Sequence, residues 1–447
     1  MRMRERTNDK EYTDKNRYSY PFHCGKFFSA MLWSRSVWFP VCGVAVFALF
    51  NVFPSFVKRP DNILRISSDG ADLLTAFLAL VCIECVLFPF YANYVTGWFS
   101  SSFWICFAII FTADLTVFWN GIIRVYATSS IIGAKWRIIG IICGMIPIAH
   151  IFVLIKIIGL VRFDVKTEED RKERNDARAA DKVCKTKYPI IFVHGVFFRD
   201  IRFFNYWGRI PKELEKNGAT IYYGEQQSAL GVAESAAEIS ERIKKIINET
   251  GCEKVNIIAH SKGGLDSRYA ITHLGLDRYV ASLTTINTPH RGCEFADWLF
   301  AKASEGFKNK LSAAYNSTLR KLGDRSPDFL SSVKDLCASE CKKLNETTPD
   351  APNVFYQSTA SKINKPLRNI PPLCFTSAFV KRFDGPNDGL VSITSAKWGE
   401  KVTVLQSNSP EGISHADMID MSRHNRKDID ILEFYVELVS DLKKRGY

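Results

Sequence analysis

One serine in the chain stands where a nucleophile would need to stand. The apolar run 255–259 is followed by a histidine, then by Ser261, and then, after a lysine, by two glycines. A serine in a tight turn between a strand and a helix presents its hydroxyl at the edge of a sheet. Such a turn needs small residues two positions before and two positions after the serine, and Ala259 and Gly263 fill them. The pattern predicts a nucleophilic serine.

Serine is a weak nucleophile unless a base accepts its proton and an acid orients that base. His415 follows the apolar run 402–405, and Asp388 lies in a glycine-rich loop that also contains the second candidate acid, Asp384. The chain order Ser, Asp, His is the order found in α/β-hydrolases. The histidines that compete with His415 for the role of base are His194, His260, His290 and His424.

The elements that would position these residues begin at Tyr188. Short strand-like runs alternate there with stretches that have helical spacing of apolar residues. We expect strands at 190–193, 220–223, 255–259, 280–286, 373–375 and 402–405, and helices at 210–217, 236–247 and 429–439. Alternation with crossovers of this length predicts an α/β fold with a mostly parallel sheet and helices on both faces.

The part of the chain before residue 164 has a different character. It contains four apolar runs, at 36–57, 73–94, 101–123 and 136–161. Each is close to the about 20 residues that a helix needs to cross a bilayer, and aromatic residues lie near the run ends. The second and third runs are joined near Gly97, which predicts a helical hairpin. The sequence predicts a helical transmembrane domain over 36–163.

The segments on either side of this domain are basic. The polar flank 1–35 lacks the apolar core and cleavage site of a signal peptide, and the charged linker 164–187 predicts an exposed helix. Four spans would place both flanks on one side, and their positive charge predicts the cytoplasmic side. If one run fails to insert, the catalytic domain faces outward. Three sequons would then be open to glycosylation, at Asn248, Asn316 and Asn345.

Charge and cysteine usage narrow the class of partner. The 447 residues carry a formal net charge of +12, but the basic residues are scattered or flank the apolar runs, and no nucleic-acid-binding motif is present. We therefore expect a membrane surface and no nucleic acid as the acidic partner. The 12 cysteines show no paired zinc-binding pattern, which favours reduced thiols in a reducing compartment.

The stretch from Tyr188 to the C-terminus resembles the bacterial triacylglycerol lipases of the Pseudomonas/Burkholderia type and their clostridial relatives. The resemblance covers nearly all of that stretch but not the apolar N-terminal segment. It implies the α/β-hydrolase fold. The motifs that carry it are Val193-His194-Gly195, Tyr206-Trp207, 256–261, Ser267-Arg268-Tyr269, 288–292, 387–391 and His415-Ala416-Asp417.

The resemblance also implies roles for individual residues. Ser261 matches the nucleophile, Asp388 the acid and His415 the base of the triad. The oxyanion hole would be formed by the backbone N–H groups of Val196 and Lys262. An insertion at about 293–350 would form the helical lid of a lipase domain that spans 188–447, with apolar and basic residues interspersed as in helices that lie on lipid.

A structural calcium lies near the histidine in many members of this family. Asp417 matches one ligand position, two residues after the base. Met421 stands six residues after the base, where the Pseudomonas enzymes have glutamine. A calcium ligand and an ordinary hydrogen-bonding residue are both open interpretations of Asp417, and no cofactor is required by the triad.

These observations predict a membrane-anchored serine lipase or esterase that hydrolyses the carboxylic esters of acylglycerols through an acyl-serine intermediate. A phospholipase or a lipid acyltransferase would use the same triad. An alternative from a different class is a non-catalytic membrane adaptor that retains the fold. An intact triad favours the enzyme.

Overall fold

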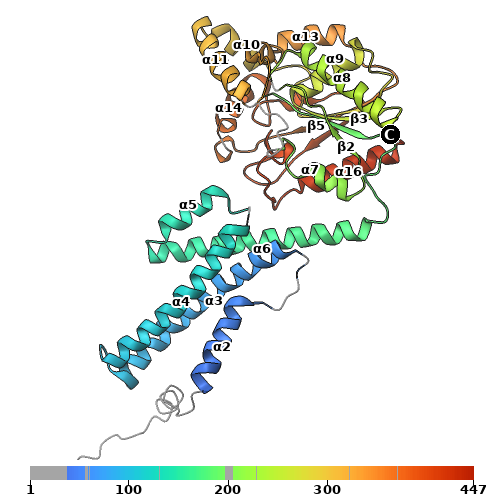
Figure 1. Ribbon diagram of the computed structural model, residues 1–447. Coiled ribbons are helices and arrows are strands. Elements are labelled where there is room, and N and C mark those ends of the chain that lie inside the picture. The colour runs from blue at the N-terminus through green and yellow to red at the C-terminus, as the bar shows by residue number, and fades with distance from the viewer. Residues whose placement is uncertain are drawn as a thin grey trace, which may run out of the picture. The chain divides into compact units, whose positions relative to one another are not determined.

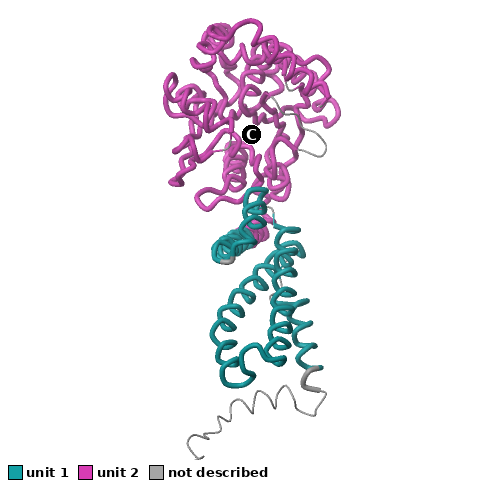
Figure 2. Tube along the Cα trace, turned by 90° about the vertical axis from the view of Figure 1, so that its left-hand side faces the viewer, with its two compact units in different colours: residues 1–166 teal, residues 167–447 magenta. Residues whose placement is uncertain are grey.

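The computed structural model describes residues 38–55, 59, 61–129, 131–196, 205–227, 229–321, 323–369 and 371–447. The predicted basic flank 1–35 lies outside the described residues. The chain divides into two compact units, residues 1–166 and 167–447, coloured separately in Figure 2. The boundary falls inside one helix, α6 (Pro147–Arg178).

The first unit consists of helices. They are α2 (Trp38–Val52), α3 (Asn62–Tyr91) with its π-helical extension (Ala92–Thr96), α4 (Ser101–Thr128), α5 (Gly133–Cys143) and the first part of α6. Helices α3 and α4 lie side by side in a hairpin that turns at Gly97, as the sequence predicts (Figure 1). Their backbones approach closely at Gly70, where a Cβ atom would lie 2.9 Å from the carbonyl oxygen of Gly121.

Two segments of this unit are long and apolar enough to cross a membrane. They are Asn62–Thr96, with a mean hydropathy of 2.4, and Ser101–Thr128, with a mean hydropathy of 1.7. The other two predicted runs differ from expectation. The run 36–57 holds only the 15-residue helix α2, and the run 136–161 is divided between α5 and α6.

The prediction of one helix over 136–161 is wrong for a local reason. Helix α5 ends at Cys143, a turn follows, and α6 starts at Pro147. Proline has no backbone N–H and is favoured in the first turn of a helix, so it begins a new helix more readily than it continues one.

The second unit is built on a six-stranded parallel sheet. The strands are β1 (Ile190–Val193), β2 (Ile221–Tyr223), β3 (Val255–His260), β4 (Val280–Ile286), β5 (Phe355–Ser361) and β6 (Lys401–Leu405). Their order across the sheet is β2-β1-β3-β4-β5-β6, and each neighbouring pair is parallel. Helices α7 (Ile210–Lys216), α8 (Val232–Thr250), α9 (Lys262–His273) and α16 (Ile431–Lys444) cover the sheet (Figure 1).

The side chains of β1 alternate between two cores. Ile190 and Phe192 pack with residues of α7 and α16, whereas Ile191 and Val193 pack with residues of α8 and α9. A central parallel strand is buried on both faces, which explains its continuous apolar sequence. The result is a three-layered α/β/α unit with the α/β-hydrolase fold, as the sequence predicts.

One strand was not predicted from the sequence, and one predicted strand is wrong. Residues 373–375 begin helix α14 (Leu373–Asp384), and the position in the sheet belongs to β5. All seven residues of β5 are buried although most are polar. Their hydrogen bonds explain this burial. Gln357 Nε2 donates to Thr284 Oγ1 at 2.8 Å, and Asn287 Nδ2 donates to Ser361 Oγ at 2.8 Å.

Helices fill the predicted lid insertion between β4 and β5. They are α10 (Glu294–Lys302), α11 (Glu305–Lys321), α12 (Phe329–Lys334) and α13 (Ala338–Thr347). Large apolar side chains of α10, α11 and the nearby α14 are exposed, among them Trp298, Phe307 and Phe375. Helix α10 contacts α14 through the stacked rings of Phe295 and Phe379, whose centroids are 5.4 Å apart. The remaining elements are the short helix α15 (Ile393–Ala396) and the 3-10 turns Pro366–Arg368 and Asp417–Ile419.

Candidate active site

Ser261 occupies a strained turn between β3 and α9. Its φ of 54° and ψ of −131° lie in a region that residues with a side chain rarely adopt. The neighbouring glycines make the turn possible. A Cβ atom on Gly263 would lie 2.4 Å from the carbonyl oxygen of His194, and one on Gly195 would lie 2.7 Å from Cβ of Ser261. The serine is therefore fixed at the end of its strand by backbone packing.

Asp388 and His415 are joined twice. Asp388 Oδ2 lies 2.6 Å from His415 Nδ1, and the backbone N–H of His415 donates to the carbonyl oxygen of Asp388 at 2.8 Å. The other carboxylate oxygen of Asp388 accepts the backbone N–H groups of Leu390 and Val391 at 2.9 and 2.8 Å. Both partners are buried. This arrangement fixes the orientation of the imidazole ring and directs Nε2 away from the carboxylate.

The histidine lies beside the strained turn. The ring centroids of His415 and His260 are 4.4 Å apart, and His260 immediately precedes Ser261. Within the described part of the chain, the Ser261 hydroxyl makes no hydrogen bond with His415. In enzymes without substrate this contact is often long and tightens only in the complex.

The rival residues have other partners. Asp384 accepts the backbone N–H groups of Glu294 and Phe295 at the start of α10, at 2.9 and 3.3 Å. His194 contacts two backbone carbonyl oxygens at 2.8 and 2.9 Å, and His290 contacts Thr285 Oγ1 at 2.9 Å. Of the histidines in the described ranges, only His415 contacts a carboxylate as an ion pair would.

Val196 and Lys262 are the two residues that are predicted to form the oxyanion hole. Val196 is buried just after Gly195, and Lys262 is the first residue of α9. The Lys262 side chain points into the protein. Its Nζ donates to Asp266 Oδ1 at 2.6 Å and to Ser235 Oγ at 3.2 Å. Burial raises the pKa of Asp266 to about 7, although the nearby lysine lowers it. Only the backbone of Lys262 is therefore available to a substrate.

Tyr206 is a site residue to which the sequence assigned no role. Its hydroxyl accepts the backbone N–H of Gly195 at 3.2 Å and lies 2.7 Å from Nδ1 of His260. Burial lowers the pKa of His260 well below its usual value, so this ring is neutral and Nδ1 can accept the tyrosine proton. Tyr206 thus links the loop after β1 to the turn that holds Ser261. The only sequence signal was the Tyr206-Trp207 motif.

The residues around Asp417 do not fit a calcium ion. The Asp417 carboxylate accepts Ser414 N and Ser414 Oγ, both at 2.8 Å, and Arg426 Nη1 at 3.1 Å. Calcium prefers six to eight oxygen ligands. The described residues contain no group of three or more His, Cys, Asp or Glu side chains that could hold a metal ion. A guanidinium group supplies the positive charge beside Asp417.

Comparisons with known proteins find triacylglycerol lipases that are similar to this chain. No family model matches the chain. Triacylglycerol lipase 2 of Saccharomyces cerevisiae is 29% identical over 260 residues, which cover 54% of this chain and 74% of the yeast protein. A triacylglycerol lipase of Burkholderia plantarii is 35% identical over 188 residues, which cover 39% of this chain and 52% of that protein.

Among solved structures, the lipase of Staphylococcus hyicus is similar with a TM-score of 0.45 and 20% identity, covering 58% of this chain and 97% of that one. By sequence, a triacylglycerol lipase of Pseudomonas fragi is also similar to this chain. The two are 27% identical, and the match covers 99% of that protein. The relatives found by sequence and the parallel sheet identify the chain as a carboxylic ester hydrolase that is similar to the bacterial triacylglycerol lipases.

Proposed function

We propose that this protein is a membrane-anchored serine lipase that hydrolyses the esters of acylglycerols. The observation that carries the proposal is the buried contact of 2.6 Å between Asp388 and His415, beside the strained turn at Ser261. The triacylglycerol lipases among its relatives support acylglycerols as the substrate class.

In the proposed mechanism, Ser261 Oγ attacks the ester carbonyl carbon and His415 Nε2 accepts its proton. Asp388 holds the Nδ1–H of the resulting imidazolium. The backbone N–H groups of Val196 and Lys262 stabilise the oxyanion, each by about 2.7–4 kcal/mol. The C–O bond then breaks, His415 protonates the leaving alcohol, and the acyl group stays on the serine. Water attacks the acyl-serine with His415 as base and releases the fatty acid. No step requires a metal ion.

Ester hydrolysis at a lipid surface is supported by the exposed rings of α10, α11 and α14. Trp298 is 43% exposed, Phe307 56% and Phe375 60%, and basic residues such as Lys302 and Lys381 accompany them. Apolar rings with flanking cations are typical of surfaces that contact a bilayer. Phospholipids or an acyl acceptor other than water are the alternative substrates for the same triad.

A fluorophosphonate probe and a substrate panel test this proposal. We expect the probe to label Ser261 in the full chain, and Ser261→Ala to lose both the label and the hydrolysis of triacylglycerol. Faster release of fatty acid from phospholipid, or transfer of the acyl group to an alcohol, would replace the lipase with the corresponding alternative. An alanine variant with full activity would refute the assignment of Ser261, and a wild type that takes no label and hydrolyses no ester would favour the adaptor.

We further propose that the first unit anchors the protein in a bilayer and leaves the catalytic unit in the cytoplasm. Ile83 and Ile105 of the two long apolar helices are 52% and 60% exposed. All the described cysteines are unpaired, in agreement with a reducing compartment. Four spans or two spans both leave the termini on one side. We expect the protein to remain with membranes through alkaline carbonate washing, and release by the wash would refute the anchor.

The side of the membrane has its own test. Of the three sequons, Asn345 donates to His290 O and accepts Arg268 Nη1, each at 2.8 Å, and Asn316 accepts Phe329 N at 3.0 Å. Asn248 is exposed on α8. In a eukaryotic host we expect no glycan on wild type, with Asn248→Gln as the matched control. A mass shift that Asn248→Gln removes would place the catalytic unit outside the cytoplasm.

A further inference from the structure

The last three turns of α6, residues 167–178, belong to the catalytic unit. The sequence predicts an exposed linker helix here, and the structure confirms the helix but buries part of one face. Arg171 has only 4% of its surface exposed. Its guanidinium contacts Asp430, the N-cap of α16, at 3.4 Å, and Arg174 contacts the same carboxylate at 2.9 Å. A buried arginine needs acceptors, and Asp430 in the C-terminal part of the chain supplies one of them.

Glu168 lies at the centre of this network. Its Oε1 accepts hydrogen bonds from Arg171 Nη1 at 2.5 Å, Asn425 Nδ2 at 2.8 Å and Arg209 Nη1 at 3.2 Å. Burial alone would raise its pKa, but Arg171, Asn425 and Arg209 outweigh burial and lower it. The two guanidinium groups converge on Asn425 Oδ1, at 2.9 and 3.0 Å, and Glu168 is the carboxylate that contacts both of them.

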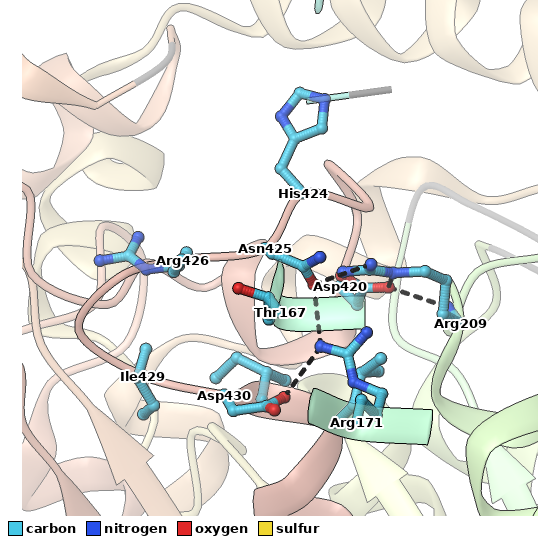
Figure 3. A pocket seen from close by; sticks show the side chains of 11 residues that line it. Thr167, Arg171, Arg209, Asp420, His424, Asn425, Arg426, Ile429 and Asp430 are labelled. Atoms are coloured by element: carbon cyan, nitrogen blue, oxygen red, sulfur yellow. Dashed lines mark hydrogen bonds and ion pairs between the residues drawn. The ribbon is translucent and has the colours of Figure 1, made fainter. Parts of the chain in front are cut away.

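Arg209 extends the network to the loop that carries His415. Asp420 accepts Arg209 N and Nε through Oδ2, at 2.9 and 2.8 Å, and Arg209 Nη2 through Oδ1 at 2.9 Å. Asp420 ends the 3-10 turn Asp417–Ile419 with a φ of 51°, five residues after His415. Figure 3 shows Arg171, Arg209, Asp420 and Asn425 directed toward one another. The loop after His415 is thus held by three hydrogen bonds from one arginine, two from its guanidinium and one from its backbone N–H.

Arg209 is also close in sequence to Tyr206, which contacts the residue before Val196. Arg209 follows Tyr206 by three residues, and the Tyr206 hydroxyl accepts Gly195 N at 3.2 Å. Between them, Gly208 packs so closely on the Asp420 loop that a Cβ atom would lie 2.4 Å from the Asp420 carbonyl oxygen. Arg209 therefore holds the loop that follows His415, and it lies in the chain segment next to Tyr206, whose hydroxyl contacts Gly195.

We propose that Glu168 is a positioning residue for catalysis, because it fixes Arg209 where the histidine loop and the Tyr206 loop meet. The inference rests on the proposed function and adds a residue from α6 to its machinery. Glu168 does not touch substrate. Without its charge, Arg209 keeps Asp420 and Arg171 keeps Asp430, but the two guanidinium groups lose the carboxylate that contacts both of them beside Asn425. Arg209 is then less firmly held, and with it the distance between His415 and the oxyanion donors.

The test compares isosteric variants of the full chain in its membrane. Glu168→Gln removes the charge of the network, and Glu173→Gln makes the same change at an exposed position of the same helix. We expect Glu168→Gln to lower kcat and the rate of fluorophosphonate labelling by about tenfold, since small displacements of catalytic groups have effects of this size or larger. KM for a short soluble ester should change less than twofold. Glu168→Asp, which keeps the charge, should recover part of kcat.

Thermal unfolding of each variant separates positioning from folding. Activity is compared at a temperature where more than nine-tenths of each variant is folded. Wild-type rates in Glu168→Gln would overturn the inference, and so would a loss of activity that matches its unfolded fraction or a Glu173→Gln variant that loses as much. Failure of the proposed function itself would look different, because wild type would then show no label on Ser261.

Discussion

Removal of the Tyr206 hydroxyl tests the link that it makes between Gly195, after β1, and His260, which precedes Ser261. In Tyr206→Phe, the backbone N–H of Gly195 and Nδ1 of His260 both lose their partner, and His260 is only 1% exposed. A buried polar group left without a hydrogen bond costs about 1–3 kcal/mol, so two such groups predict a loss of about 2–6 kcal/mol in the free energy of unfolding.

A second buried tyrosine provides the matched control. Tyr435 is fully buried in the same core, and its hydroxyl donates to the carbonyl oxygen of Met418 at 2.8 Å. Tyr435→Phe leaves one carbonyl without this donor, which predicts a loss of about 1 kcal/mol. Both variants remove one oxygen atom, so the difference between them isolates the two groups that Tyr206 serves.

Urea unfolding followed by tryptophan fluorescence measures this difference, because Trp207 is buried beside Tyr206. With a urea dependence of about 2–3 kcal/mol per M, the midpoint of Tyr206→Phe should fall by about 1 M or more. Labelling of Ser261 should slow by about tenfold, as expected when an oxyanion donor loses its orientation. A Tyr206→Phe variant as stable and as reactive as Tyr435→Phe would refute the reasoning.

Three further predictions concern other residues of the catalytic unit. Asp388→Asn should lower kcat by about ten-thousandfold with little unfolding, because its Oδ1 still accepts the backbone N–H groups of Leu390 and Val391. Asp384→Asn should keep most of the activity, because Asp384 contacts the start of α10 and not His415. Ester hydrolysis measures the activity of both variants, and the melting temperature measures their stability. Burial raises the pKa of Asp266 from 3.8 to about 7, so between these pH values the folded protein keeps a proton that the unfolded chain releases. This group therefore makes stability fall by up to about 1.4 kcal/mol per unit as pH rises, and Asp266→Asn should flatten that slope in urea titrations from pH 4 to 7. Gly263→Ala should destabilise by about 1–3 kcal/mol because its methyl group would meet a carbonyl oxygen at 2.4 Å, whereas Gly306→Ala, with open space around it, should be neutral or stabilising.

Local patterns predicted much of this molecule. The turn at Ser261, the paired residues Asp388 and His415, and five of the six strands could be located because each depends on residues that are close in the sequence or on apolar periodicity. The strand β5 escaped prediction because its residues are polar and its burial depends on hydrogen bonds to β4. The break before Pro147 was missed because apolar residues continue on both sides of it.

The network around Glu168 had no sequence signal at all. Glu168 and Asn425 are 257 residues apart, and a charged helix next to an apolar segment has the composition of an exposed linker. Only the fold determines that Arg171 and Arg209 converge there. Tyr206 had a weak signal, since it belongs to a motif, but its partners come from two other loops.

The polar pairing of β4 and β5 has a consequence for how the chain folds. On a ribosome, β4 is made well before β5, and its free edge stays unpaired while the helices α10 to α13 are synthesised. An exposed apolar edge would be an aggregation hazard during that interval. The edge of β4 instead carries Thr284, whose hydroxyl accepts a hydrogen bond from Gln357 once β5 has paired. A strand that pairs in the wrong register would bury these polar groups without partners. The polar pairs between β4 and β5 therefore favour the native register when the late strand joins the sheet.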